Sequence, residues 1–536
     1  MLRYKERTSR NRHESSDVLY KCNAMSSQIK AQPYQALFAT EHIEHDLKEK
    51  SIRGGFYTMC SEGISAVLRV GSIAILARIL VPEHFGLLSM VTALTAFAER
   101  FQDLGLSLAT VQQKRITHEQ VSTLFWINLV FGAILTLGIA VLSNLIAWFY
   151  GDARLIWITV AIASSFFWSG LTVQHQAILR RQMRFAQIAG INLGANALSI
   201  VVAIYLAVNG SGYWALVWRE VARSVFITIG TWAVCPWMPG APAPYREVRS
   251  MIKFGRDICG FNIIHFFASS FDQVLIGKVY GAEPLGFYRQ AWQLMFVPIS
   301  LLQYPIHYVA ESTLSVLQSN REKYRECYQK ILTLVSFVSM PLAVYLFLYA
   351  KDIVLLVLGQ KWLPASELFQ IFSILAFVAP LSNTTGFVMI TCGQSKRYLL
   401  VGVLNALTLI LAFCIGIMWG ARGVAIGYVA ATCIMFVPSL WIAFRGTPIT
   451  LWLFFRTILR PMFASVIMAV VLALYSNIIV LDSSAEAIGT SLVIAVALYV
   501  GTWAVIPGGR RTLMEMLSYV LVISESQRMQ RQAQWT

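Results

Sequence analysis

The sequence predicts an all-α protein that crosses a membrane many times. Of its 536 residues, 57% are hydrophobic and 13% are charged, whereas soluble chains carry about 25% charged residues. Apolar runs of about 20 residues recur along the chain, and a helix of this length crosses the hydrocarbon core of a bilayer. Because the runs are continuous and do not alternate with polar residues, they do not suit a transmembrane β-barrel.

Fourteen membrane-spanning helices are expected, because polar segments containing Gly, Pro or charged residues separate the apolar runs. Near the chain start, the first apolar run follows a long polar tail, and near its end the last run precedes a basic one. The predicted spans are about 56–80, 85–110, 121–147, 155–178, 186–208, 213–235, 254–280, 285–310, 328–350, 363–391, 398–418, 423–444, 456–479 and 487–506.

The connecting loops predict the orientation of these helices. Alternate loops hold 18 Lys and Arg residues, and the opposite loops hold about six. Since Lys and Arg are enriched in cytoplasmic loops, both tails are expected in the cytoplasm, as an even number of spans requires. The net charge of +16 is attributed to loops that face anionic membrane lipids, and no nucleic-acid partner is expected.

The chain also repeats internally at an offset of 200 residues. The segment 75–90 matches the segment 275–290, and Gly86 pairs with Gly286. Each repeat holds six spans, an even number, so the two lobes are expected to be parallel, with a site between them. The predicted segments are a polar, disordered cytoplasmic tail (1–53), an N-lobe of helices 1–6 (54–235), a basic, Pro-rich linker (236–253), a C-lobe of helices 7–12 (254–444), an extra helix pair (445–506) and a basic cytoplasmic tail (507–536).

Polar residues on the first helix of each lobe predict a water-filled cavity. In the first span they follow helical spacing, and the equivalent positions of the second repeat are also polar. Arg69 lies near the middle of its span, where an arginine costs about 2.5–3.5 kcal/mol, so a role in the cavity is favoured over an ion pair with Glu62. The polar residues are Glu62, Ser65, Arg69 and Ser72, and Asn262, His265, Ser269 and Asp272.

Other charged residues in the spans are candidates for binding an anionic head group or a coupling ion. Arginines four residues apart present one cationic face, which suits a phosphate group, although pairing with Glu220 or snorkelling to the interface remains an alternative. The carboxylates are candidates for proton or sodium coupling, although Glu99 and Asp103 also suit a brace at a helix end, and Asp272 suits a partner for Arg69. The head-group candidates are Arg219, Arg223 and Arg289, and the coupling candidates are Asp272, Glu99 and Asp103.

Motifs of common enzyme classes are not found. The sequence has no P-loop, no D-x-D pair, no HExxH and no G-x-S-x-G. Its eight cysteines contain no C-x-x-C and are interpreted as small buried hydrophobic residues. We therefore expect a transporter without catalytic residues, metal or bound cofactor, coupled if at all to a proton or sodium gradient.

Two segments of the first lobe resemble the Wzx-type polysaccharide flippases, a branch of the multidrug/oligosaccharidyl-lipid/polysaccharide exporter superfamily. They are GSIAILARILVPEHFGLLSM (71–90) and FQDLGLSLATVQ (101–112). The resemblance is strongest to the colanic acid and succinoglycan exporters and runs from about Asp46 to Pro507. It implies two six-helix lobes in a V shape around a cavity, with two extra helices. About 45 extra polar residues precede the usual start, and Met25 is an alternative first residue.

The resemblance also implies a function. Wzx-type flippases move a polyprenyl-pyrophosphate-linked oligosaccharide from the cytoplasmic to the periplasmic leaflet of the bacterial inner membrane, for exopolysaccharide or lipopolysaccharide synthesis. Cavity cations bind the pyrophosphate in related flippases, and Arg69 is the best match to such a residue. Polysaccharide polymerase or export machinery is a possible partner. The alternatives are a cation-coupled multidrug antiporter, which would favour cavity carboxylates, and a polysaccharide polymerase, which would need a long outer loop.

Overall fold

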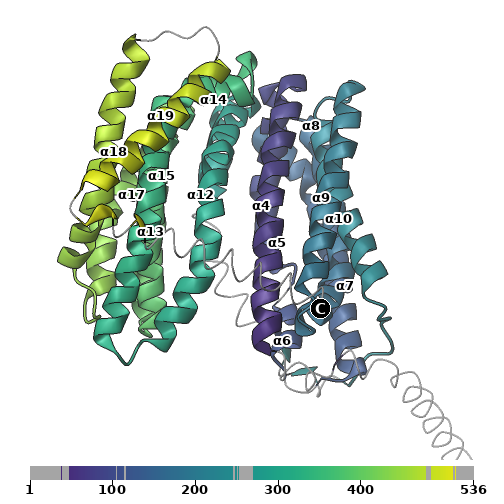
Figure 1. Cartoon of the computed structure of the whole chain (residues 1–536). Coiled ribbons are helices and arrows are strands. Elements are labelled where there is room, and N and C mark those ends of the chain that lie inside the picture. The colour runs from purple at the N-terminus through teal and green to yellow at the C-terminus, as the bar shows by residue number, and fades with distance from the viewer. Residues whose placement is uncertain are drawn as a thin grey trace, which may run out of the picture. The chain divides into compact units, whose positions relative to one another are not determined.

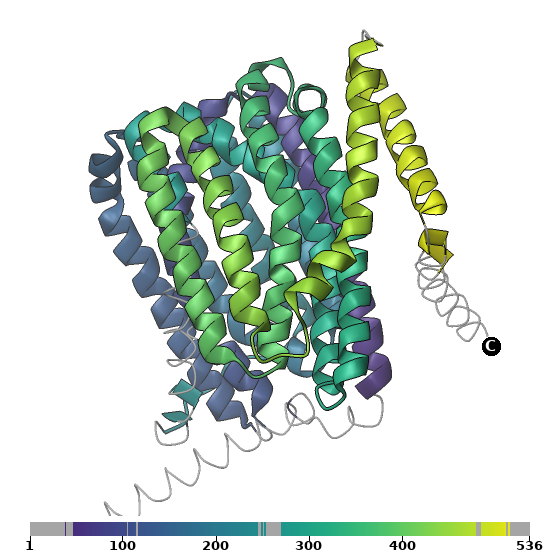
Figure 2. The same cartoon turned by 90° about the vertical axis from the view of Figure 1, so that its left-hand side faces the viewer.

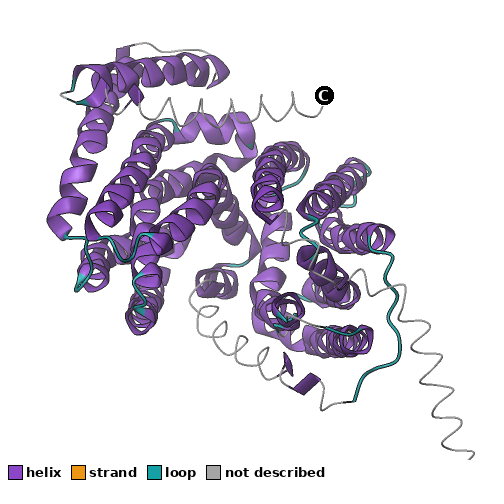
Figure 3. Cartoon of the chain, turned by 60° about the horizontal axis from the view of Figure 1, so that its bottom comes forward, coloured by secondary structure: helices purple, strands orange, loops and turns teal. Residues whose placement is uncertain are grey.

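The computed structural model describes residues 38, 47–103, 105–113, 116–244, 248–249, 251–252, 270–478, 484–506, 508–510 and 513–514. Within these residues the chain is built from helices and contains no strand (Figure 3). In chain order (Figure 1), the helices are α4 (Leu47–Ile79), α5 (Pro82–Phe101), α6 (Leu106–Gln112), α7 (His118–Tyr150), α8 (Arg154–Arg181), α9 (Phe185–Val208), α10 (Trp214–Val234), α12 (Ala282–Val316), α13 (Arg321–Leu348), α14 (Ala350–Val357), η2 (Gln360–Trp362), α15 (Leu363–Thr391), α16 (Ser395–Gly416), η3 (Ile417–Trp419), α17 (Gly420–Phe444), α18 (Leu451–Ile478) and α19 (Ser484–Val505).

The predicted all-α, polytopic membrane fold is confirmed. The predicted spans overlap long helices, with two exceptions: the span 85–110 is divided between α5 and the short helix α6, and of the span 254–280 the structure describes only the helical part 270–280. In the described ranges, nine segments are long and apolar enough to cross a membrane by length and composition alone. Helices α5, α10 and α12 are not among these nine, and each carries charged residues.

Local sequence signals explain where α7 begins and ends. Thr117 Oγ1 accepts a hydrogen bond from the Gln120 amide (3.2 Å), and Gln120 Oε1 accepts one from the Thr117 amide (3.0 Å). This reciprocal capping box satisfies two amide groups that the first turn leaves without partners. At the other end, Gly151 adopts a left-handed conformation with φ of 77°, which glycine adopts without a steric penalty.

The chain forms two compact units. Unit 1 comprises the described residues of Met1–Ser65, Thr95–Ala203 and Val217–Ile263, and unit 2 those of Ala66–Leu94, Ile204–Leu216 and Ile264–Thr536. The divisions fall inside helices α4, α5, α9 and α10. The lobe, linker and tail boundaries that the sequence suggests therefore stay a prediction.

In unit 1, α7 packs closely on α8 because two glycines lie at their contact. A Cβ atom on Gly132 would lie 2.7 Å from the Phe166 carbonyl oxygen, and one on Gly170 would lie 2.8 Å from that of Asn128. Small residues allow helix backbones in a membrane to approach closely. Phe38, from the predicted tail, is buried in the same unit, and its carbonyl oxygen accepts a hydrogen bond from Arg181 Nε (3.1 Å).

The first half of the Pro-rich segment 236–253 is also bound to unit 1. Trp237 Nε1 donates to His118 Nδ1 (3.0 Å), and the Gly240 amide donates to Ser122 Oγ (2.9 Å). Trp126 Nε1 donates in turn to the Gly240 carbonyl oxygen (3.0 Å). Residues 237–240 are thus held on α7 by side-chain hydrogen bonds as well as by packing.

In unit 2, the core lies among α12, α13, α15, α17 and α18. It includes the aromatic side chains of Tyr324, Tyr328, Phe387, Phe444 and Phe454. Helix α18 stands beside α13 and leads into α19, at the yellow end of the colour range (Figure 2). The last two helices are therefore part of the unit 2 packing.

Candidate functional site

The polar residues of the first span become more buried along α4, from Glu62 to Ser72. Glu62 is exposed, Ser65 and Arg69 are half-buried, and Ser72 is buried with its hydroxyl donating to the Arg69 carbonyl oxygen (2.9 Å). An ion pair between Arg69 and Glu62 is not among those that the described residues form. The Arg69 guanidinium has no hydrogen-bond or ion-pair partner in the described part of unit 2.

The second set of polar residues is described only at its last position. Asn262, His265 and Ser269 lie outside the described residues. Asp272 lies on the helical segment 270–280 and is only 6% exposed. The polar stripe on the first helix of each lobe therefore stays a prediction.

Asp272 is the centre of a buried polar cluster in unit 2. Its Oδ2 atom accepts a hydrogen bond from the Tyr288 hydroxyl group (2.7 Å), and its Oδ1 atom is buried without a partner. Arg289, on the first turns of α12, lies close enough to act electrostatically on the carboxyl group. Gln290, two positions after Tyr288 on α12, is also buried with an unpartnered Oε1 atom, but no hydrogen bond among the described residues joins it to Asp272. The structure thus brings together two predicted site residues, Asp272 and Arg289, from separate helices.

Sequence reasoning missed Tyr288 and Gln290, although a signal for them exists. Positions 288–290 read Tyr-Arg-Gln, whereas the equivalent positions 88–90 of the first repeat read Leu-Ser-Met. At positions 288 and 290 the second copy therefore has a polar residue where the first copy has an apolar one, and at position 289 it has an arginine where the first copy has a serine. In a membrane helix such a change is costly unless it serves a site.

In unit 1, the three charged residues of α10 form no ion pair with described residues. Arg219 is half-buried, and its Nε atom is buried without a hydrogen-bond partner. Arg223 is exposed one turn further along, and Glu220 is half-buried. A buried donor without a partner costs about 1–3 kcal/mol. An anion that occupied this face of α10 would remove that cost for Arg219.

The two carboxylates near the end of α5 differ in their contacts. Glu99 is exposed. Asp103 accepts hydrogen bonds from the Ser107 amide (2.9 Å) and from the Ser107 hydroxyl. These are the contacts of a residue that stabilises the N-terminus of a helix, here the seven-residue helix α6. The structure therefore favours the interpretation of Asp103 as part of a helix end.

Within unit 2, the two copies of the repeated motif contact each other near the N-termini of α5 and α12. A Cβ atom on Gly86 would lie 1.7 Å from the Ala282 carbonyl oxygen, and one on Gly286 would lie 2.0 Å from that of Pro82. With the repeat offset of 200, these two contacts are equivalent to each other. We refer to them as the glycine crossing. Only glycine fits at either position without moving a backbone.

A second set of contacts in unit 2 holds the C-terminal end of α4, next to the start of α5. Trp362 Nε1 donates to the Ala77 carbonyl oxygen (2.8 Å), and Phe85 packs edge-on against the Trp362 ring with centroids 5.2 Å apart. Arg78 donates to the carbonyl oxygen of Leu356, near the end of α14 (2.8 Å). A cation at a helix C-terminus satisfies carbonyl groups that lack a helical partner. These contacts and the glycine crossing therefore join the helix ends that carry the repeated motif to neighbouring helices of unit 2.

Among the described residues there is no cluster of three or more His, Cys, Asp or Glu side chains that could hold a metal ion. The described cysteines (Cys60, Cys235, Cys327, Cys392, Cys414 and Cys433) are free thiols. The candidate residues are thus arginines in unit 1, and arginines, the Asp272 carboxyl group and neutral side chains in unit 2. These groups suit binding of an anion and a small cation or proton.

Known proteins with similar sequences take part in polysaccharide synthesis. The chain is 25% identical to the teichuronic acid biosynthesis protein TuaB of Bacillus subtilis (strain 168) over 434 residues, which cover 79% of this chain and 89% of the relative. It is 24% identical to the lipopolysaccharide biosynthesis protein WzxC of Escherichia coli (strain K12) over 441 residues, with coverages of 80% and 89%. The predicted resemblance to Wzx-type transporters is confirmed.

Solved structures show a matching fold. The lipid II flippase MurJ, in an inward closed conformation, superposes with a TM-score of 0.67 at 14% sequence identity, covering 84% of this chain and 98% of that one. The fold is that of the exporter superfamily, as predicted, and the expectation of a transporter agrees with the names of these neighbours, a flippase and a multidrug transporter. The family model described as polysaccharide biosynthesis protein matches residues 75–367, and the chain therefore belongs to this family.

Proposed function

We propose that this protein moves a polyprenyl-pyrophosphate-linked oligosaccharide repeat unit from the cytoplasmic to the periplasmic leaflet of a bacterial inner membrane. Exopolysaccharide or lipopolysaccharide synthesis would use the product. The family and the relatives named for polysaccharide biosynthesis support this proposal. A charged sugar head group cannot cross hydrocarbon unaided, and a polar path through the protein would shield it while the lipid tail stays in the bilayer.

The observation that carries the proposal is the unpartnered guanidinium of Arg219. Its Nε atom is buried and has no partner, and its neighbours Val217 and Val221 on α10 are buried apolar residues. An arginine offers donors in a planar fork that matches phosphate oxygens. A pyrophosphate group would supply both the missing acceptors and the missing negative charge. Arg69 and Arg223, which also form no ion pair with described residues, are the further head-group candidates.

Asp272 is the candidate for coupling to a proton or sodium gradient. A buried carboxyl group with one unpartnered oxygen gains from taking up a proton or a small cation, because its desolvated charge is then compensated. The Tyr288 hydroxyl group donates to the other oxygen and fixes the orientation of the group. An anionic substrate that bound to Arg289 would weaken the electrostatic effect of the Arg289 charge on the Asp272 carboxyl group.

Alternating access would require the glycine crossing to open. The N-termini of α5 and α12 are in backbone contact there, so no head group could pass between them. The positive-inside rule assigns this end of the helices to the periplasm and both chain termini to the cytoplasm. Membrane lipids and a polysaccharide polymerase are the proposed partners.

The sidedness of the lipid-linked oligosaccharide tests this function. Cells depleted of the protein are expected to accumulate complete repeat units that a membrane-impermeant lectin cannot reach in spheroplasts. Units that reach the outer leaflet but stay unpolymerised would instead indicate a polymerase, and absence of accumulation would indicate export of another compound.

The same assay tests Arg219. Arg219→Ala is expected to reduce flipping at least ~10-fold, which corresponds to about 1.4 kcal/mol, with normal protein abundance, and Arg219→Lys to retain part of the activity. Arg422→Ala is the matched control, because Arg422 is exposed and pairs with Glu367 (2.9 Å). Equal activity of the Arg219→Ala and Arg422→Ala variants would exclude Arg219 from the substrate site.

A further inference from the structure

Three arginines of unit 2 meet at the turn that follows α17. Arg325 comes from the second turn of α13, Arg397 from the first turn of α16, and Arg445 from the turn itself. Arg325 Nε donates to the Pro448 carbonyl oxygen (2.6 Å), and Arg397 Nη1 donates to that of Arg445. We refer to these three arginines as the arginine cluster. Helices α13 and α16 thus both hold the stretch 445–448.

The turn presents the carbonyl group that Arg397 binds. Arg445 has φ and ψ of -61° and 119°, and Gly446 has a left-handed φ of 76°, as the two central positions of a type II turn require. The Thr447 amide closes the turn on the Phe444 carbonyl oxygen (3.0 Å). This bond leaves the Arg445 carbonyl oxygen to accept from Arg397. The position of Arg397 is therefore set by the backbone of the turn and not by a counter-charge.

No described carboxylate group compensates the charge of the arginine cluster. Its three members form no ion pair with a described residue, and neither do the exposed Glu322 and Glu326 of α13. A guanidinium group has five N–H donors. The hydrogen bonds of the cluster use one nitrogen of Arg325 and one of Arg397. The remaining donors, and all those of Arg445, have no acceptor among the described residues.

The arginine cluster lies at the ends of two apolar helix faces. Helices α16 and α17 lie side by side (Figure 2) and carry exposed apolar residues at the spacing of one helix face. The Arg445 guanidinium group lies over the ring of Trp441, one turn back along α17, at 5.4 Å from its centroid, and tryptophan is typical of the membrane interface. Arg397 is one turn from the exposed Leu400. The two faces comprise Leu400, Leu407 and Leu411 of α16 and Ile434, Val437 and Trp441 of α17.

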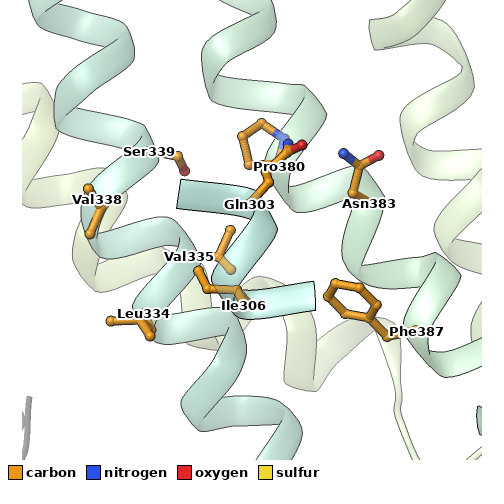
Figure 4. A pocket seen from close by; sticks show the side chains of 9 residues that line it. All are labelled: Gln303, Ile306, Leu334, Val335, Val338, Ser339, Pro380, Asn383 and Phe387. Carbon is orange, nitrogen blue, oxygen red and sulfur yellow. The ribbon is translucent and has the colours of Figure 1, made fainter. Parts of the chain in front are cut away.

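A surface pocket elsewhere in unit 2 lacks this combination of charge and apolar surface. It lies between α12, α13 and α15 (Figure 4), and its nine lining residues include no charged one. An anionic group there would have no cation to compensate its charge. Of these two places, the arginine cluster is therefore the one that suits an anionic ligand.

We propose that the arginine cluster binds the head group of an anionic phospholipid of the surrounding bilayer, such as phosphatidylglycerol, whose acyl chains lie along α16 and α17. Guanidinium groups donate to phosphate oxygens in pairs, and basic sites between membrane helices bind anionic head groups. The turn holds Arg325 and Arg397 in place before the lipid arrives, which lowers the ordering cost of binding. The site is separate from the substrate and coupling residues discussed above and does not depend on the proposed function.

Binding of radiolabelled phosphatidylglycerol to the purified full-length protein in detergent tests the proposal. At about 0.15 M salt, exposed charges more than ~8 Å apart are largely screened, so only arginines at the head group should matter. Arg397→Gln with Arg445→Gln should weaken binding at least ~10-fold, which corresponds to about 1.4 kcal/mol. Arg445→Gln alone should weaken it by about 5-fold. Because the Arg445 side chain forms no hydrogen bond with a described residue, this variant separates loss of lipid binding from loss of the turn.

Lys323→Gln with Arg456→Gln is the matched control, because it removes the same charge from loops that are expected on the same side of the membrane. Both side chains are exposed and form no hydrogen bond with a described residue, and Lys323 does not share a helix face with Arg325. We expect this control to bind the lipid within ~2-fold of the wild-type protein. Equal losses in the control and in the Arg397→Gln, Arg445→Gln variant would show a general effect of basic loops and overturn the site.

Competition distinguishes a lipid from a soluble phosphate compound. Unlabelled phosphatidylglycerol should displace the label, whereas glycerol 1-phosphate, which has the phosphate group without acyl chains, and zwitterionic phosphatidylcholine should not. Displacement by glycerol 1-phosphate as readily as by phosphatidylglycerol would assign the cluster to a soluble ligand. Equal displacement by phosphatidylcholine would assign the binding to the acyl chains alone. Either result would overturn the proposal.

Discussion

The structure of the glycine crossing predicts how far the ends of α5 and α12 must separate when one of its glycines is replaced by alanine. In Gly286→Ala the new Cβ atom would lie 2.0 Å from the Pro82 carbonyl oxygen and 2.8 Å from its carbon. Both obstacles are backbone atoms, so no side-chain rotation relieves the contact. Carbon and oxygen atoms that are not bonded stay more than 3 Å apart, and the N-termini of α5 and α12 must therefore separate by about 1 Å.

Overpacking of this kind costs about 1–3 kcal/mol. If the cost is confined to the conformation in which the crossing is closed, the ratio of open to closed molecules rises by roughly 5- to 150-fold, at 1.4 kcal/mol for each factor of ten. Leu285, adjacent to the glycine, is completely buried and is a suitable probe when replaced by cysteine in a background without other cysteines. We expect Gly286→Ala to accelerate labelling at position 285 by an impermeant maleimide within this range.

Gly402→Ala is the control for this experiment. Gly402 lies in α16, and a Cβ atom there would meet no atom within 4 Å, so alanine should be neutral or stabilise the helix by about 0.5–1 kcal/mol. The double substitution Gly86→Ala with Gly286→Ala should cost less than the sum of the two, because one separation of the helices relieves both contacts. Labelling in Gly286→Ala that equals labelling in Gly402→Ala would refute the reasoning.

Three further predictions follow from the site and the loops. Arg69→Ala should abolish export without reducing protein abundance, and loss of folded protein would instead indicate a structural role for this side chain. Asp272→Asn should weaken the dependence of flux on the ion gradient, and Tyr288→Phe should do so less, because it removes one hydrogen bond but keeps the carboxyl group; unchanged dependence in both variants would exclude the cluster from coupling. Asp152 lies outside the spans and accepts hydrogen bonds from Arg154, which lower the pKa of its carboxyl group. The pair therefore stabilises the fold at pH values above the unfolded pKa of about 3.9. This stabilisation is lost as the pH falls through the lower pKa of the folded state. Thermal unfolding of Arg154→Ala should accordingly show a loss of about 0.2–1 kcal/mol at pH 7 that disappears in acid, and a loss that persists there would contradict the assignment.

Most of the helices could be predicted from the sequence because a helix that crosses hydrocarbon needs about 20 predominantly apolar residues, whereas α5, α10 and α12 also carry charged residues. The internal repeat identified Gly86 and Gly286 as equivalent positions. It did not predict that these glycines contact the opposite copy of their own motif, because equivalence in a sequence says nothing about distance. The helix α4 also begins at Leu47, nine residues before the predicted span, since its first turns are polar.

The candidate site was predictable only where a charge stands out against apolar neighbours. Arg69, Arg219 and Asp272 were identified in this way. Tyr288 was not, because a tyrosine near the end of a span is usually an interfacial anchor, and its role depends on a carboxyl group sixteen positions earlier.

The two contacts of the glycine crossing have the reciprocity of a twofold homodimer interface, since each motif presents the equivalent positions to the other. In a dimer of single repeats, one substitution at such an interface would appear twice and act on both contacts at once. In the fused chain each half can change alone. The strength with which the crossing holds its two helices together can therefore be adjusted one contact at a time, a freedom that joining the repeats into one polypeptide makes available.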